Sequence, residues 1–476
     1  MMKNLKLKMP STYTIIIIII VMVAVLSWII PGGTYEYEDS GISNPRPVPN
    51  TYHHIDSNPQ GIGDIIMAPV QGFMEAVDII LYTLVIGGFL AVVMKTGAID
   101  AGIGHTIRRL KGREKLLIPV LMLIFSLAGA GFGIEEETLP FFLVLIPVFL
   151  AAGYDTLTGI SVIKIGAGLG VMATVASPFS TAIASRFADI SMGDGIVIRL
   201  ILLAIYLPAG IIFTMRYAEK VKKDPTKSLV YKQKEEHEKM FLKDVNVNEV
   251  VEFTTMRKLV LIVFTGAFIA MMWGVLPWED LGLTFIPTMN WWFGELSAVF
   301  LVASVIVAFI AKVKEEKFIE TFLDGAKDLL GVAVIIGVAR GVAVIMDNAM
   351  ITDTVLHFGE SILSSTSSSI FTGASYFIFL VLSFFIPSSS GLATLSMGIM
   401  APLADFAGVG REIVVIAYQT SNAMLALISP TVAILMGVLV MTKTSYITWV
   451  KFVWKFLAFI AIITILVLVG ATILIY

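Results

Sequence analysis

The sequence predicts an all-α integral membrane protein with about 11 transmembrane helices and two opposed re-entrant hairpins, arranged as two inverted repeats. Three observations predict this fold class. The chain of 476 residues is 57% hydrophobic and only 14% charged, which excludes a soluble globular protein. Apolar stretches near or above about 18 residues recur along its length, as a bilayer requires. Finally, the sequence matches itself when it is shifted by 252 positions.

The internal duplication is marked by matching interruptions of apolar segments. The shift places Ser177-Pro178 on Ser429-Pro430 and Met172 on Met424. Each interruption follows an apolar hairpin with a polar tip, Gly131–Thr138 in the first copy and Pro387–Gly391 in the second. Duplicated, interrupted hydrophobic segments are the best sequence indication of a secondary transporter with its binding site near the bilayer midplane.

The first half of the chain is assigned from its charges, because basic residues favour the cytoplasmic side. Residues 1–30 form a first scaffold span that begins in the cytoplasm, and 31–77 form an external loop with an interfacial helix. Residues 78–215 form repeat one, with a hairpin at 116–152 and an interrupted span at 157–190. If the hairpin crossed the membrane twice, its three glutamates would lie at the outer surface. We expect a re-entrant hairpin, because only this leaves the basic segment 216–258 in the cytoplasm.

The second half follows with the opposite sense. Residues 216–257 form a charged cytoplasmic connector, which we expect to be a solvated helix rather than a binding site for a partner. Residues 258–330 supply a linker span, a scaffold span and a second interfacial helix. Residues 331–476 form repeat two, with a hairpin at 370–406 and an interrupted span at 412–440. The C-terminus is then external, the external segments carry only Arg46 and Arg411 as basic residues, and the two repeats run in opposite directions.

Both interruptions gather polar side chains that can line a binding site. Proline removes a backbone donor and disfavours helix in the residue before it, so backbone groups nearby are freed to bind a ligand. The candidate binding residues in these two segments are Ser177, Ser180, Thr181, Thr420, Ser421, Asn422, Ser429 and Thr431. Three small residues, Gly166, Gly168 and Gly170, would let the first hairpin approach closely. The alternative is that these residues only pack the spans together.

The two hairpin tips differ in charge. The first tip carries Glu135, Glu136, Glu137 and Thr138, and the second carries Ser388, Ser389, Ser390 and Gly391. Carboxylates at mid-depth are costly, so they must bind a cation, take a proton or pair with a basic residue. The candidate basic partners are Lys164, Arg186 and Arg340, and a purely structural ion-pair network is the alternative. An acidic tip facing a hydroxyl-lined tip favours a substrate that carries positive charge.

Other functions find little support in the sequence. Arg340 could clamp a substrate carboxylate or neutralise a glutamate, and we weigh these two roles equally. The chain has no Cys, and its five His residues form no metal-binding spacing. No phosphate-binding loop is present, so an enzyme, a bound cofactor and a nucleic-acid partner are not expected. Membrane lipid and a small-molecule substrate are the expected partners.

Four segments resemble a known family. The glutamate-rich tip, Phe322–Asp328, Met346–Met350 and Phe385–Gly391 together resemble the YfcC-type branch of the C4-dicarboxylate anaerobic carrier family, in the ion transporter superfamily. The resemblance implies an elevator-type secondary carrier in the bacterial inner membrane, working as a homodimer. Family members are described as dicarboxylate carriers or as arginine/ornithine antiporters. We therefore expect a carrier of basic amino acids, with a Na⁺- or H⁺-coupled C4-dicarboxylate carrier as the alternative.

The coupling ion is also considered from the resemblance. In sodium-coupled relatives, Ser-Asn-Thr triplets at the hairpin tips hold the ion and the substrate carboxylate. This chain has Glu-Glu-Glu-Thr and Ser-Ser-Ser at those places. If Na⁺ is the coupling ion, we expect it near Gly133, Thr420, Ser421 and Asn422.

Overall fold

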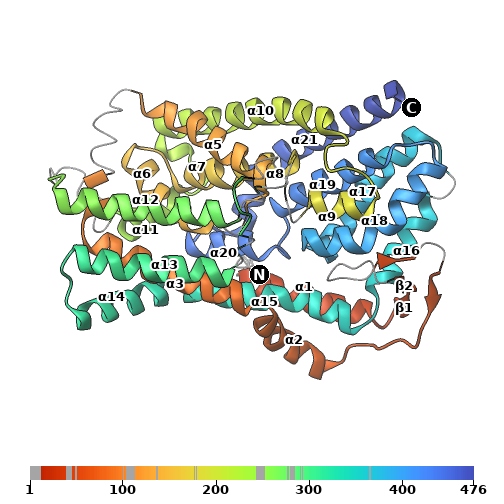
Figure 1. Cartoon of the computed structure of the whole chain (residues 1–476), viewed down its shortest axis with the longest axis horizontal. Coiled ribbons are helices and arrows are strands. Elements are labelled where there is room, and N and C mark those ends of the chain that lie inside the picture. The colour runs from red at the N-terminus through yellow and green to blue at the C-terminus, as the bar shows by residue number, and fades with distance from the viewer. Residues whose placement is uncertain are drawn as a thin grey trace, which may run out of the picture.

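The computed structural model is almost entirely helical (Figure 1). It describes residues 12–38, 46–48, 51–99, 101–102, 113–135, 138–175, 177, 180–242, 252–275, 278, 285–289, 291, 293–363 and 366–475. The strands found there are four of two residues each: β1 (Gly33–Thr34) pairs with β4 (His53–His54), and β2 (Tyr37–Glu38) with β3 (Arg46–Pro47). These short pairs lie in the predicted external loop, and the all-α fold class is confirmed.

Seven helices of the described residues are long and apolar enough to cross a membrane. They are α3 (Val77–Lys95), α5 (Leu117–Phe132) with the turn η1 (Glu114–Leu116) before it, α10 (Ile196–Lys223), α13 (Phe293–Ile310), α15 (Leu330–Asn348), α17 (Ser368–Phe385) and α21 (Tyr446–Ile475). Three shorter apolar helical segments accompany them, at Tyr13–Leu26, Leu139–Ala151 and Thr156–Met172. The protein is therefore a multi-pass membrane protein.

The helices themselves repeat in order. The first series is α2 (Ile62–Glu75), α3, α5, α6 (Leu139–Ala151), the run α7–η3–α8 (Thr156–Ile160, Ser161–Ile165 and Gly166–Met172), α9 (Thr181–Phe187) and α10. The second series is α14 (Glu315–Asp328), α15, α17, α18 (Ser389–Phe406), α19 (Arg411–Ala426), α20 (Ala433–Met441) and α21. Corresponding helices are separated by about 252 positions, within the uncertainty of helix ends. The duplication seen in a few identities thus extends over seven helical segments.

Equivalent helices also end in the same way. Gly97 follows α3 with φ 67°, and Met350 follows α15 with φ 55°. Gly153 and Gly408 follow the two hairpins with φ 84° and 66°. A residue in the left-handed region is a common helix terminator, and it is uncommon for a side chain as large as that of Met350. The shared chain reversal at this site therefore supports a common origin of the two repeats.

The helices form two groups, which lie one above the other in Figure 1. The lower group holds α1 (Thr12–Leu26), α2, α3, α13, α14 and α15, with α12 (Thr255–Val275) packed on α13 and lying above it; the upper group holds both hairpins and both interrupted spans, of which α20 extends down to pack on α15. Within the lower group each interfacial helix packs on a helix of the other repeat: α2 packs on α15, and α14 packs on α3. Glycines permit both contacts: Gly72 lies against the backbone of Gly337 and Gly341, and Gly325 against that of Gly87. This reciprocity is what a two-fold relation between the repeats produces.

An unpredicted amphipathic helix, α16 (Thr352–Leu363), fixes the first loop to repeat two. The Tyr35 hydroxyl donates to Glu360 Oε2 at 2.7 Å, and the Tyr37 hydroxyl to Asp353 Oδ2 at 2.7 Å. Both carboxylates are buried. Sequence patterning missed α16 because two of its buried residues, Asp353 and Glu360, are acidic, and only the tyrosines of a distant loop make their burial favourable.

The charged connector is not simply solvated. After the turns η4 (Pro225–Lys227) and η5 (Tyr231–Gln233), it forms α11 (Lys234–Phe241), which buries His237. His237 Nδ1 lies 2.9 Å from Thr156 Oγ1 of α7, and Glu236 forms an ion pair of 2.7 Å with Lys443, which follows α20. Hence α11 has a solvated face and a docked face, and it connects the interrupted spans of both repeats.

We expect the docking of α11 to weaken as the pH falls below about 6.5. Burial lowers the pKa of His237 below its ordinary value of 6.5, although the charges of Glu236 and Asp155 act in the opposite direction. His237 therefore holds its proton less tightly when α11 is docked than when it is undocked. Docking is at full strength at pH values above the ordinary pKa of 6.5, and it is lost as the pH falls from 6.5 toward the lower pKa of the docked His237.

A spin label on Met240→Cys would measure this docking, since the chain has no other cysteine. In the otherwise unchanged protein, we expect the mobility of the label to rise as the pH is lowered from about 7.5 to about 5.5. In His237→Gln the mobility should not depend on pH. Equal pH profiles in the two proteins would contradict the prediction.

Candidate functional site

A cavity of about 320 Å³ lies between the two groups of helices. It is lined by both hairpin tips, by both interruptions and by the lower group at the α2–α3 junction and α15. Its charged and polar wall consists of Glu75, Asp78, Glu135, Ser177, Ser180, Arg340, Ser388, Ser389, Ser390, Tyr418, Gln419, Asn422 and Thr431, together with the backbone of Gly133. Segments more than 300 residues apart in the chain thus meet at one place.

Tip one is built by a left-handed glycine. Gly133 ends α5 with φ 73°, and its N–H donates to Gly129 O at 2.8 Å. A side chain at this position would overlap the Ser177 hydroxyl, so the tip sits directly against the first interruption. Beyond Glu135, the Thr138 hydroxyl donates to the Glu135 carbonyl at 2.5 Å and closes the turn before α6.

The first interruption is fastened to the hairpin it follows. The Val175 N–H and the Thr174 hydroxyl both donate to Ala130 O near the end of α5, at 2.8 and 2.9 Å. Ser177 then accepts a hydrogen bond from the Ser180 N–H at 3.3 Å. Among the described residues of this interruption, the N–H groups of Val175 and Ser180 are therefore satisfied by protein, as irregular backbone at membrane depth requires.

Tip two begins a helix rather than ending one. Pro387 follows α17, and Ser388 is the N-cap of α18, accepting from the Gly391 N–H at 3.2 Å. The Tyr418 hydroxyl donates to Ser389 O at 2.6 Å and holds this tip against α19. The N-terminal turn of α18, with its positive end of the helix dipole, is consequently part of the cavity wall.

The second interruption lies between α19 and α20. The hydroxyls of Ser429 and Thr431 are 2.7 Å apart, and α20 starts two residues after Thr431, so that the cavity is also lined by Val432, Ala433 and Ile434. Asn422 Nδ2 donates to Ser383 Oγ of hairpin two at 3.3 Å.

Two ion pairs fix the charged residues. Lys164 Nζ lies 3.6 Å from Glu135 Oε2, as one of the expected pairings. Arg340 Nε lies 2.8 Å from Glu75 Oε2 on α2, so it neutralises a glutamate, one of the two roles weighed for it, although this glutamate does not belong to tip one. Arg186 is exposed. The Arg340 guanidinium thus joins α15 to α2 within the lower group.

The cavity contains most, but not all, of the sequence candidates. Ten of them line it: Gly133, Glu135, Ser177, Ser180, Arg340, Ser388, Ser389, Ser390, Asn422 and Thr431. Six lie behind the wall: Thr138, Thr181, Gly391, Thr420, Ser421 and Ser429. In particular, the hydroxyls of Thr420 and Ser421 donate to carbonyls of their own helix, at 2.7 Å each. Glu136, Glu137 and Pro178 lie outside the described residues.

Four polar residues of the wall were missed from the sequence: Glu75, Asp78, Tyr418 and Gln419. Gln419 is the most informative, because its amide donates to Thr174 O at 2.8 Å and to Thr181 Oγ1 at 2.6 Å, joining α19 to the other repeat's interruption. Its position directly before the candidates Thr420-Ser421-Asn422 was the feature of the sequence that could have identified Gln419 as part of the site. Glu75 was placed in the interfacial helix and Asp78 at the start of repeat one, not at the site.

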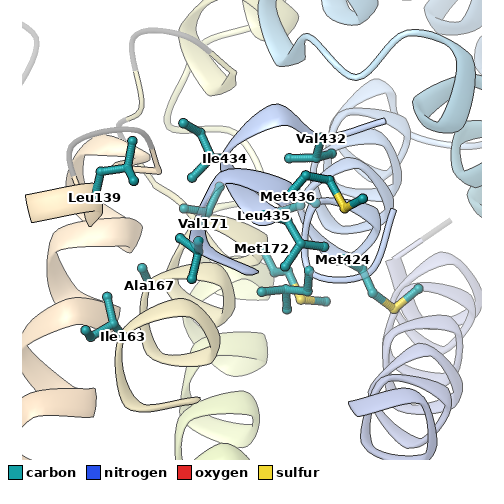
Figure 2. Packing of buried hydrophobic residues seen from close by; sticks show 14 of the residues in the cluster. Leu139, Ile163, Ala167, Val171, Met172, Met424, Val432, Ile434, Leu435 and Met436 are labelled. Carbon is teal, nitrogen blue, oxygen red and sulfur yellow. The ribbon is translucent and has the colours of Figure 1, made fainter. Parts of the chain in front are cut away.

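An apolar cluster supports the wall from behind. Figure 2 shows Val171 and Met172 at the end of α8 gathered with Met424 of α19 and with Val432, Leu435 and Met436 beside and within α20. Met172 and Met424 are the residues that the 252-position shift superimposes, and both are buried. Glycine again allows close packing, since Gly166 and Gly170 face α5 while Gly168 faces Leu427.

A helical membrane protein whose paired hairpins and broken helices enclose a polar cavity belongs to the class of secondary transporters. Comparison with known proteins supports this class. The family model described as "DcuC: C4-dicarboxylate anaerobic carrier" matches residues 9–473. The chain therefore belongs to the C4-dicarboxylate anaerobic carrier family, a family of carriers and not of enzymes.

Two curated relatives match almost the whole chain. A Haemophilus influenzae protein, described as uncharacterized, is 32% identical, with 97% of this chain and 96% of that protein covered. The Escherichia coli K12 protein named "Putative basic amino acid antiporter YfcC" is 30% identical, with the same two shares covered.

Two solved structures are also similar. The YdaH transporter of Alcanivorax borkumensis has a TM-score of 0.43 at 12% identity, covering 97% of this chain and 98% of that chain. MtrF of Neisseria gonorrhoeae has a TM-score of 0.42 at 16% identity, covering 97% and 95%.

Proposed function

We propose that this secondary transporter carries a basic amino acid, such as arginine or ornithine, by exchange or by ion-coupled alternating access. The observation that carries the proposal is the charge of the cavity wall. Three carboxylates, Glu75, Asp78 and Glu135, face one guanidinium, Arg340, among the described lining residues. Even when Lys164, which pairs with Glu135 from outside the lining, is included, three carboxylates stand against two basic groups. Since charges at this depth must be compensated, an excess of carboxylates favours a cationic ligand.

The opposite wall suits the carboxylate that every amino acid carries. The N-terminal turns of α18 and α20 line the cavity, and helix N-termini offer N–H groups and a positive dipole end to anions. A substrate with its carboxylate toward these turns would direct its cationic side chain toward Glu135 and Asp78. The volume of 320 Å³ lies at the small end of the range of about 300–1,000 Å³ for small-molecule sites.

A C4-dicarboxylate coupled to Na⁺ or H⁺ is the second candidate. It is favoured by the description of the family model and by the two helix N-termini and Arg340. Against it stands the pairing of Arg340 with Glu75, which already neutralises the one cationic group among the described residues of the wall. The name of the Escherichia coli relative agrees with the first candidate.

The remaining features of the carrier are proposed from charge and resemblance. We place it in a bacterial inner membrane as a homodimer, with its N-terminus in the cytoplasm and its C-terminus outside. The lower group of helices would be the fixed scaffold. The upper group would be the mobile part of an elevator, and α2 and α14, at the scaffold, would be the two arms that join the scaffold to it.

Proteoliposomes preloaded with ornithine test the substrate. We expect them to accumulate labelled arginine, with the label retained only when a counter-substrate is inside, and we expect excess succinate not to compete. Vesicles loaded with ornithine, with succinate or with buffer, made from one protein preparation, provide the matched comparison. Exchange of succinate without any response to arginine would overturn the proposal in favour of the second candidate.

A further inference from the structure

The Glu135 carboxylate of tip one is paired with a cation of the protein itself, the Lys164 ammonium. Lys164 is 1% exposed and does not line the cavity, whereas the Glu135 side chain is 17% exposed and does. The Glu135 carboxylate therefore has the cavity on one side and the Lys164 ammonium, 3.6 Å away, on the other. Any cation that enters the cavity meets a carboxylate that is already paired from behind.

Local structure places this ammonium at depth. Lys164 lies on η3, a π-helical turn at Ser161–Ile165 between α7 and α8, and every residue of η3 is buried. It is eight residues beyond Thr156, the start of α7, which corresponds to roughly 12 Å along the helix at about 1.5 Å per residue. Single π-turns inside helices often occur at functional sites. A lysine at such depth persists only with a close counter-charge, so Lys164 and Glu135 require each other.

Two backbone oxygens at the first interruption, Ala130 O and Thr174 O, are also occupied. In ion-coupled carriers, carbonyls of unwound helix segments coordinate the coupling cation. Here Ala130 O accepts two hydrogen bonds, from Val175 N and Thr174 Oγ1, at 2.8 and 2.9 Å. Thr174 O also accepts two, from Gln419 Nε2 at 2.8 Å and Thr181 Oγ1 at 3.3 Å. A carbonyl oxygen has two lone pairs, so both acceptors are saturated by protein donors.

We propose that Lys164 is a resident counter-cation of tip one, standing where a coupling Na⁺ would otherwise neutralise Glu135. The carrier then works without Na⁺. Lys164 is a positioning residue: it holds the acidic tip in place when the cavity is empty, and the cationic group of the substrate shares Glu135 with it. The part about the substrate rests on the proposed function, whereas the independence from Na⁺ does not.

Thermal unfolding of the purified, full-length protein in NaCl, compared with KCl and choline chloride at equal ionic strength, tests the proposal. The unchanged protein should show no Na⁺-specific change in Tm. In Lys164→Gln the Glu135 carboxylate loses the ammonium that lies 3.6 Å away, and we expect Na⁺ to raise Tm by about 2–4 °C by binding in its place. Adding Glu135→Gln to Lys164→Gln should abolish that response.

Two further variants control for loss of a buried charge. Arg199→Gln removes a fully buried cation on α10, away from tip one, and should give no Na⁺ response even where it lowers Tm. Lys164→Arg keeps the charge and should behave as the unchanged protein does. A Na⁺-specific rise in Tm of the unchanged protein overturns the proposal, and that measurement stands even if Lys164→Gln fails to fold. A folded Lys164→Gln without any Na⁺ response also overturns it.

The same assay separates this proposal from the substrate. Arginine and succinate are added to the unchanged protein without Na⁺, and a stabilisation by succinate alone would reject the basic amino acid while leaving the role of Lys164 intact. A stabilisation by arginine that requires Na⁺ would reject the role of Lys164 and leave the substrate intact.

Discussion

Replacing Glu135 with glutamine is expected to reduce arginine exchange by roughly a hundredfold or more. Removing one partner of a buried ion pair costs about 3–5 kcal/mol, because the other charge is left without compensation, and each 1.4 kcal/mol or so corresponds to about a factor of ten in binding. Here the uncompensated charge is the Lys164 ammonium, which would repel a cationic substrate. The initial rate of labelled arginine uptake into ornithine-loaded vesicles measures the effect.

Two variants distinguish a binding role of Glu135 from a structural one. Glu135→Asp retains the charge and should keep measurable exchange. The pair Glu135→Gln with Lys164→Gln removes both charges, so Tm should recover toward that of the unchanged protein while exchange stays lost. Glu238→Gln, on helix α11 of the charged connector, is the matched control outside the cavity and should exchange normally. Exchange at the normal rate in Glu135→Gln would contradict the prediction.

Gly170→Ala is expected to destabilise hairpin one by about 3 kcal/mol, because the added methyl group overpacks the contact between α5 and α8. A Cβ on Gly170 would overlap the Ser126 carbonyl oxygen and lie 2.8 Å from Ala130 N, and both are backbone atoms that cannot rotate away. Ala130 O in turn carries the hydrogen bonds of the first interruption, so the displaced backbone includes the cavity wall. Thermal unfolding monitored by size-exclusion chromatography measures the loss.

Gly131→Ala is the matched control, since it makes the same chemical change on α5 itself. A Cβ there has nothing within 4 Å, and replacing a helical glycine by alanine favours the folded state by about 0.5–1 kcal/mol. Its Tm should therefore stay or rise. Similar Tm changes in the two variants would show that the close approach of α5 and α8 does not limit stability.

The sequence alone located the elements of the cavity with useful accuracy. Both tips and both interruptions line it, because the signals that mark them are local: a proline or a run of small polar residues ends a helix regardless of what surrounds it. The duplication was visible for a related reason. The two interruptions keep the same residues, Ser177-Pro178 and Ser429-Pro430, at one constant shift, and α3 and α15 keep the same length.

The residues that were missed share a different property. Tyr418 and Gln419 lie in the middle of α19, where nothing in the local sequence distinguishes a residue that faces the other repeat from one that faces its own. Thr420 and Ser421, their neighbours, turn their hydroxyls to their own helix. Which side of a fully buried helix meets the cavity depends on its rotation, and rotation is set by long-range packing. For the same reason α16 was recognised only through its tyrosine partners.

From the sequence alone one learns that this protein crosses the membrane many times, that it repeats itself, and that its helices break at two acidic or hydroxyl-rich places. These properties follow from hydropathy and from backbone chemistry, which act over a few residues. The tertiary structure decided how the charges are paired: Lys164 with Glu135, and Arg340 with Glu75, 265 positions away. Coulomb energy depends on distance in space, so an acidic tip acquires its counter-charge only when the helices have packed.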